Sequence, residues 1–235
     1  MMRMVWEDLA FLHWAVNPAL LRPLLPPGLE LDLYEGQAWL AVVPFFMRDV
    51  APRLWPLAKA QPDFEELNLR TYVRVGDRPG VWFFSLDAGS RLAVRVARRF
   101  FHLPYMDAKF ETAAEPDGGI GGWLYGSERR HRGEPPASFR ARFRPTGPVR
   151  FAEPGSLEEF LTERYCLYAH DGRGLVRGDI HHGRWPLQRA ETEIERNTLA
   201  DSIGVTLEGP PLAHFARRLE VVAWWPRPVF RQMAP

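Results

Sequence analysis

The sequence predicts a fold made mainly of antiparallel β-strands, closed as a barrel, with a few short helices packed outside it. Two observations favour this class. The 235 residues include 22 prolines and 19 glycines, which indicates many turns and short elements rather than long helices. Several segments also alternate between apolar and polar residues, the pattern of a strand with one buried face. Many strands and few helices are typical of a barrel.

The first half of the chain contains three predicted strands and two helices. Asn17 followed by Pro18 is a helix start that leads into Ala19 to Leu24. Gln37 to Met47 is apolar on both faces, so we expect a strand that is covered on both sides. Strands at Leu67 to Val75 and Val81 to Asp87 flank a turn-rich segment and predict a hairpin. An apolar stripe predicts a helix over Ser90 to His102, with four arginines away from it (Arg91, Arg95, Arg98 and Arg99).

The second half is mostly strands. In Ser138 to Arg144 the apolar Phe139, Ala141 and Phe143 alternate with arginines. Ser156 opens a short helix with a capping box that extends to Thr162, and another short helix begins near Thr198. Further strands are expected at Ala108 to Ala114, Gly122 to Arg130, Leu175 to His182 and Ala216 to Trp225, and loops at Val50 to Asp63, Glu115 to Gly122, Gly133 to Ala137 and Gly209 to Leu212.

Composition narrows the class of protein. With 46% hydrophobic and 25% charged residues, the chain is neither disordered nor collagen-like. No convincing linker interrupts it, so we expect one domain over residues 1–235. The net charge of +1 lacks the basic excess of a dedicated nucleic-acid binder, so no nucleic-acid partner is expected.

A cytoplasmic location is the expectation. Cys166 is the only cysteine, so no intramolecular disulfide can form, which fits a reducing compartment. Met1 to Val16 lacks the apolar region and cleavage site of a signal peptide. The longest apolar run, Ala38 to Met47, is far shorter than the roughly 20 residues of a membrane-spanning helix. No membrane partner is expected.

Two polar residues on the Leu67 to Val75 strand are candidates for a binding site. Asn68 and Arg70 share one face. If that face lines the interior of the barrel, the planar guanidinium of Arg70 could hold an anionic substrate or a buried carboxylate. If the face is turned to solvent, both are ordinary surface residues.

His181 and His182 form the most conspicuous pair, but strand alternation sends their rings to opposite faces, so they do not bind one metal ion together. Asp179 shares the face of His181 and could orient its ring, which makes His181 the candidate catalytic residue. The alternative is an ion-pair ladder on the surface of a strand. No histidine spacing resembles a metal signature, so we expect no metal and no cofactor.

The remaining candidates have structural explanations that stay open. Cys166 is either a nucleophile beside a histidine or a core residue. Lys109 is either a Schiff-base lysine or an exposed one, and the four-arginine helix face either binds an anionic partner or is solvated. Trp185, just after the histidine pair, either covers a cavity mouth or closes the core.

Motifs spread over nearly the whole chain resemble the YqjF-like family (DUF2071) of uncharacterised bacterial proteins. They include Phe11-Leu12-His13-Trp14, Ala38-Trp39-Leu40, Val43-Pro44-Phe45, Glu66 to Val73, Leu103-Pro104-Tyr105, Phe160 to Tyr165, Ile180-His181-His182 and Trp185-Pro186-Leu187. This family in turn resembles acetoacetate decarboxylase, which implies a β-barrel or double sheet around an internal cavity.

The decarboxylase chemistry does not carry over. That enzyme forms a Schiff base on a lysine just after a proline, and the proline matches Pro104. Tyr105 follows it here, and Lys109 comes a few residues too late. The cavity arginine of the enzyme corresponds to a position near His13, where this sequence has no arginine. Its cavity carboxylate falls on the strand of Asn68 and Arg70, where we expect no acid.

The leading hypothesis is therefore a protein that binds a small, anionic organic molecule in an internal cavity. Arg70 would pair with the anion, and His13, Asn68, Tyr105 and Trp185 would contribute further contacts. Whether acid/base chemistry follows is left open, as are a non-catalytic carrier or sensor, a protein-interaction module, and a homodimer through an open sheet edge.

Overall fold

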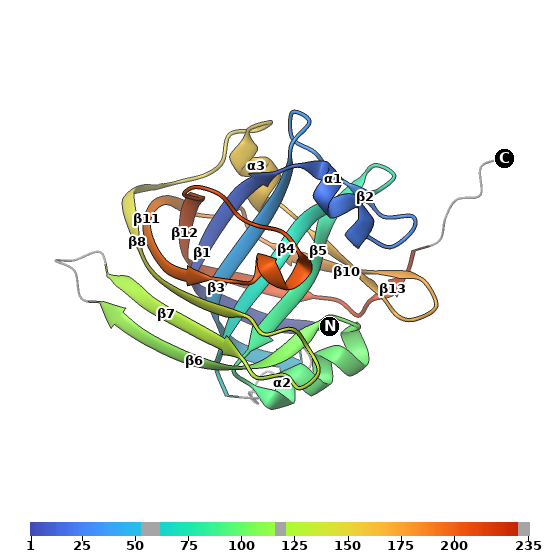
Figure 1. Cartoon of the computed structure of the whole chain (residues 1–235), viewed down its shortest axis with the longest axis horizontal. Coiled ribbons are helices and arrows are strands. Elements are labelled where there is room, and N and C mark those ends of the chain that lie inside the picture. Colours follow the sequence, from blue (N-terminus) through green and yellow to red (C-terminus); the bar gives the residue numbers. More distant parts are fainter. Residues whose placement is uncertain (53–61, 116–120, 230–235) are drawn as a thin grey trace.

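The computed structural model describes residues 1–52, 62–115 and 121–229 and is dominated by one continuous sheet (Figure 1). The predicted mainly β fold with a few short helices is confirmed. The strands are β1 (Met2–Val16), β2 (Glu30–Leu31), β3 (Ala38–Pro52), β4 (Phe64–Val75), β5 (Arg78–Ala88), β6 (Tyr105–Glu115), β7 (Gly122–Arg129), β8 (Ser138–Arg150), β9 (Cys166–His170), β10 (Leu175–His182), β11 (Leu187–Asn197), β12 (Leu212–Ala223) and β13 (Arg227–Pro228).

The sheet closes on itself twice. Strands β12, β1, β3, β4 and β5 form a shared wall, in which each strand pairs with the next in the antiparallel sense. On one side of this wall the circuit closes through β9 and β10. On the other side it closes through β6, β7, β8 and β11. Figure 1 shows β6 and β7 as a long arm that leaves the central strands.

Strand alternation divides the interior into two cores because β1, β3, β4 and β5 are buried on both faces over much of their length. On β1, Leu9 and Phe11 belong to the core enclosed by β9 and β10, whereas Ala10 and Leu12 belong to the core under β7, β8 and β11. Burial of β3 on both faces, predicted from its continuous apolar run, is confirmed. The polar side chains in the central parts of β3 and β4 are consequently buried in one of the two cores.

The helices are short and capped as expected. They are α1 (Pro18–Leu21), η1 (Arg22–Leu24), α2 (Arg91–Val96), η2 (Ala97–Phe101), α3 (Leu157–Thr162) and η3 (Ala200–Ile203). Asn17 caps α1 by accepting from the Ala19 N–H at 2.9 Å, and Ser156 caps α3 by accepting from the Glu159 N–H at 3.2 Å. Continuing α2, η2 has π-helical hydrogen bonding and ends at the left-handed His102 (φ 55°). Among the described residues, no helix is long and apolar enough to cross a membrane.

Five strands were not predicted from the sequence: the two-residue β2 and β13, and the longer β1, β9 and β11. β1 contains Glu7 and Asp8, and the positive φ of Asp8 (49°) accompanies an irregular register with β3, so its alternation is broken. β9 is only five residues long. β11 carries glutamates that pair across the sheet with the arginines of β8, as in Glu191 with Arg144. The predicted Val50 to Asp63 and Glu115 to Gly122 loops lie largely outside the described residues.

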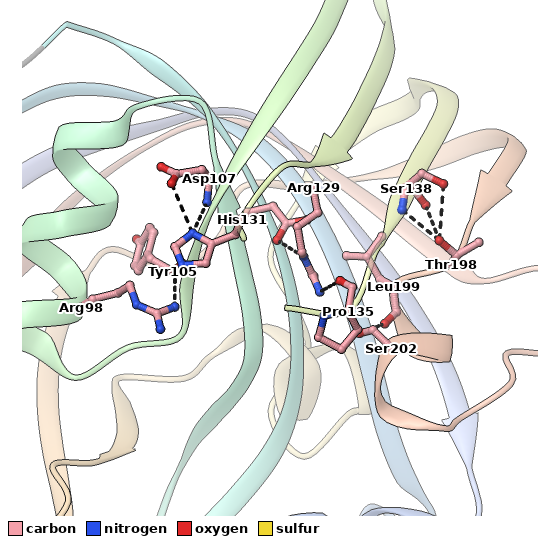
Figure 2. A network of polar contacts seen from close by, with 11 residues as sticks. Arg98, Tyr105, Asp107, Arg129, His131, Pro135, Ser138, Thr198, Leu199 and Ser202 are labelled. Carbon is pink, nitrogen blue, oxygen red and sulfur yellow. Dashed lines mark hydrogen bonds and ion pairs between the residues drawn. The ribbon is translucent and has the colours of Figure 1, made fainter. Parts of the chain in front are cut away.

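A buried ion pair joins the shared wall to the β6–β7 arm. The Arg129 Nε donates to Asp87 Oδ1 at 2.9 Å, and both side chains are 1% exposed. Arg129 Nη1 also donates to the carbonyl of Pro135 at 3.2 Å (Figure 2). The pair thus connects β5 and β7 with the segment before β8.

Replacing one partner of this pair leaves a buried charge without compensation. We expect Arg129→Met to lower the free energy of unfolding by about 3–5 kcal/mol. The matched control is Arg130→Met, because Arg130 is exposed and pairs with the exposed Glu128. That change is expected to stay within about 0.5 kcal/mol of the wild type in urea unfolding. Equal effects of the two variants would contradict the assignment.

Candidate functional site

A cavity of about 220 Å³ lies in the core enclosed by β9 and β10. The strands of the shared wall, β10 and the α2–η2 helical segment contribute its lining, which is mostly aliphatic and aromatic. Few polar side chains line it, and these are the groups able to orient a ligand. They are Glu66, Asn68, Arg70, Tyr105, Thr162, Arg164 and His182.

β4 contributes three of these polar residues from one face. Glu66, Asn68 and Arg70 alternate along the strand and line the cavity, while Leu67 and Leu69 belong to the opposite core. Of the two alternatives for Asn68 and Arg70, the structure therefore selects the interior one. Both side chains are buried.

The expectation that no acid stands on this strand is wrong. Glu66 lies two residues before Asn68, on the same face, and is 1% exposed. Burial raises the pKa of its carboxyl from 4.5 to about 7. Extending the alternation of Asn68 and Arg70 back by one step would have found it.

Tyr105 and Glu66 form a hydrogen-bonded pair at the cavity wall. The Tyr105 hydroxyl donates to Glu66 Oε2 at 2.9 Å, and burial raises the pKa of the phenol well above its usual value. Arg98, in the π-helical segment, holds the tyrosine backbone by donating from Nη1 to its carbonyl at 2.8 Å (Figure 2). Tyr105 directly follows Pro104, the place at which the resemblance puts the Schiff-base lysine.

Arg70 is a buried cation without an acidic partner. Among the described residues no carboxylate pairs with it, and its Nε–H has no hydrogen-bond acceptor. Its guanidinium carbon lies 5.4 Å from the centre of the Phe11 ring and 5.8 Å from that of Tyr72. By contrast, the neighbouring Arg164 is neutralised by Asp32 at 2.5 Å.

Two tryptophans add unpaired donors to the same cavity. Trp6 and Trp185 stack with ring centres 5.9 Å apart, and both line the cavity. The buried indole N–H of each has no acceptor within the described part of the chain. Buried donors are normally paired, so these groups suit a ligand that supplies acceptors.

His13 supports the site from behind the cavity wall. It is 1% exposed, and burial lowers its pKa well below the usual value, so the ring is neutral. The Tyr72 hydroxyl donates to the carbonyl of Leu161 at 2.8 Å. The hydroxyl must then accept from His13 Nε2–H, which lies 2.7 Å away. His13 is not part of the cavity lining.

The histidine pair divides as the alternation predicts, and the member that lines the cavity is His182 rather than His181. His181 is exposed on the outer face of β10. Asp179, on that face, forms ion pairs with Arg78, Arg177 and Arg227, and none joins it to His181. The catalytic role predicted for His181 therefore receives no support from its position.

His182 is fixed by its neighbours. Its Nδ1–H donates to the carbonyl of Gly183 at 2.7 Å, and the ring stacks on Tyr165 with centres 4.7 Å apart. Burial lowers its pKa.

The other nucleophile candidates lie outside the cavity. Lys109 is exposed on β6 and pairs with Glu111 at 3.0 Å. Cys166 is a core residue whose thiol donates to the carbonyl of Pro79, and burial raises its pKa. In the described ranges no three His, Cys, Asp or Glu side chains gather as metal ligands.

The fold is similar to that of solved enzymes. An enduracididine biosynthesis enzyme, MppR, in complex with the condensation product of pyruvate and imidazole 4-carboxaldehyde matches with a TM-score of 0.65 and 12% identity, covering 97% of this chain and 88% of that one. Acetoacetate decarboxylase from Legionella pneumophila matches with a TM-score of 0.62 and 14% identity, covering 99% of this chain and 88% of that one. An acetoacetate decarboxylase-like enzyme from Sphingomonas wittichii RW1 matches with a TM-score of 0.59 and 17% identity, covering 94% of this chain and 90% of that one.

Sequence similarity is much closer to a protein of undescribed activity. The uncharacterized protein YqjF of Bacillus subtilis (strain 168) is 45% identical over 224 residues, which cover 95% of this chain and 90% of the relative. The family model DUF2071, described as an uncharacterized conserved protein, matches residues 3–220. The chain therefore belongs to the DUF2071 family and has an acetoacetate decarboxylase-like fold.

Proposed function

We propose that this protein binds a small organic carboxylate in its cavity and moves a proton on it. The carboxylate pairs with Arg70, and the Glu66–Tyr105 pair acts as the acid/base group. The observation that carries the proposal is the buried guanidinium of Arg70, which has no acidic partner among the described residues and whose Nε–H lacks an acceptor, in a cavity that also holds the unpaired N–H donor of Trp185. A carboxylate supplies both the negative charge and the acceptor oxygens that these groups lack.

Acid/base chemistry suits the pair because a proton-transfer group works best when its pKa is near the ambient pH. Glu66, with a pKa of about 7, both takes and gives protons at neutral pH. The Tyr105 hydroxyl keeps its proton and orients the carboxyl. Of the described lining residues none is a lysine, so the proposed reaction uses no Schiff base there.

The fold neighbours support the choice of ligand chemistry. The acetoacetate decarboxylases are named for acetoacetate, and MppR has been solved in complex with pyruvate. Both compounds are small oxo acids. Because these proteins share only 11–14% identity with this chain, they support a class of ligand and not a particular reaction.

Removal of the Arg70 charge should weaken ligand binding without unfolding the protein. A buried cation without a partner is costly, so we expect Arg70→Met to leave the melting temperature of the free protein unchanged or higher. Affinity for carboxylates should fall roughly 10- to 150-fold, the value of a charged hydrogen bond. Calorimetric titration and thermal shift measure both effects. Arg74→Met, at an exposed position on the same strand, is the control; equal losses in both variants would count against the site.

The buried Glu66 should make stability depend on pH. Its folded pKa of about 7 exceeds its unfolded value of 4.5, so the native state binds more protons in between, and the free energy of unfolding falls as pH rises through this range. Relative to Glu66→Gln, we expect the free energy of unfolding of the wild type to fall by about 3 kcal/mol as the pH rises from 4.5 to about 7. Urea unfolding across the range measures it. Tyr105→Phe, which removes a hydrogen bond that lowers this pKa, should move the transition to higher pH. Parallel pH profiles of wild type and Glu66→Gln would contradict the assignment.

Proton transfer itself can be followed by solvent exchange. In D₂O, the C3 proton of 2-oxohexanoate passes to the Glu66 carboxylate, and a deuteron returns to the same carbon. We expect the protein to accelerate this exchange, and Glu66→Gln to slow it by about 10²–10⁴-fold, as measured by NMR. Binding of the acid without accelerated exchange would instead identify a non-catalytic carrier.

A further inference from the structure

We propose that the ligand is a monocarboxylate with an apolar tail, of about six to eight carbons in all. This inference rests on the proposed function, since it takes Arg70 as the anchor of the carboxylate. It adds the position of the rest of the molecule, which lies toward the end of the cavity formed by the first residues of β1, the last third of β3 and the helical segment α2–η2.

The cavity changes from polar to apolar along its wall. Glu66, Asn68 and Arg70 follow one another on β4, and Phe64 precedes them on the same face. Phe64 pairs with Met47 of β3, and Met47 pairs with Trp6 of β1. Beyond the polar stretch the lining is therefore apolar, and it includes Met2, Met4, Trp6, Met47, Val50, Phe64, Leu92, Val96, Ala97 and Phe101.

The volume indicates a ligand larger than a three-carbon acid. A cavity of about 150 Å³ holds a benzene molecule of six carbons. By proportion, the 220 Å³ found here holds roughly nine non-hydrogen atoms, which corresponds to a carboxylate with a tail of about six carbons. Pyruvate would leave the apolar end unfilled. Flexible methionine side chains adapt to tails of different shape.

The charges of the lining select a monoanion. Arg70 is the unpaired cation among the described lining residues, because Asp32 neutralises Arg164. No charged side chain occurs at the apolar end of that lining. A second carboxylate there would lose its hydration without gaining a partner, so dicarboxylic acids are excluded.

A chain-length series tests the inference. Calorimetric titration of straight-chain monocarboxylates from three to twelve carbons should show the affinity rising about fourfold per methylene until the tail fills the apolar end, and then no further rise. The dicarboxylic acid and the primary alcohol of eight carbons should both bind far more weakly than octanoate. Equal affinity at all lengths, or tightest binding of the shortest acids, would overturn the inference while leaving the proposed function intact. Failure of every monocarboxylate to bind would overturn both.

Two variants separate the tail from the carboxylate. Ala97→Phe fills the apolar end, so we expect octanoate to bind at least tenfold more weakly while propionate binds unchanged. Met4→Trp should act in the same direction from β1, should Ala97→Phe not fold. The control is Arg99→Phe, since Arg99 is an exposed residue of the same helical segment and not part of the lining. Equal weakening of octanoate and propionate would contradict the placement of the tail.

Discussion

The structure depends on one constraint: the strands β1, β3, β4 and β5 are buried on both faces. Two circuits of strands close over the same wall, so alternate side chains enter different cores. Over the central part of these strands neither face is available to water, and a polar residue there must find a partner inside the protein or in a ligand. This requirement explains why few polar side chains line the cavity. Most buried polar side chains are paired, as Arg129 is with Asp87, but Arg70 is not.

The contrast between these two arginines separates structural from functional burial. Arg129 holds a carboxylate at 2.9 Å and joins two parts of the sheet. Arg70 lies between aromatic rings and retains an unpaired N–H beside a cavity, an arrangement that costs stability. Glu66, kept partly protonated by burial, belongs to the same class of strained polar groups. Such groups occur together in one cavity, which is the pattern expected of a binding or catalytic site.

Local patterns predicted much of this fold, because they report burial directly. The alternation in Ser138 to Arg144 and the helix cap at Ser156 both appear in the structure, although the Glu159 carboxylate accepts from the Gly155 N–H and does not complete the capping box at Ser156. β1 was missed because its two buried faces and its irregular register hide the alternation. Which histidine of the pair faces inward depends on which side of β10 is covered, a non-local property that the sequence does not encode in any short segment. Glu66 was within reach of the argument, since it keeps the phase of Asn68 and Arg70.

The pairing of β1 with β12 joins residues 2–13 to residues 212–223, close to opposite ends of the described chain. Both circuits pass through this pair, so neither barrel can close on a ribosome until β12 has been synthesised. Until then β1, which is rich in apolar residues, lacks a partner on one edge and is open to association with other chains. We therefore expect folding to be slow relative to that of a helical protein of similar size, because the β1–β12 contact joins residues about 200 positions apart.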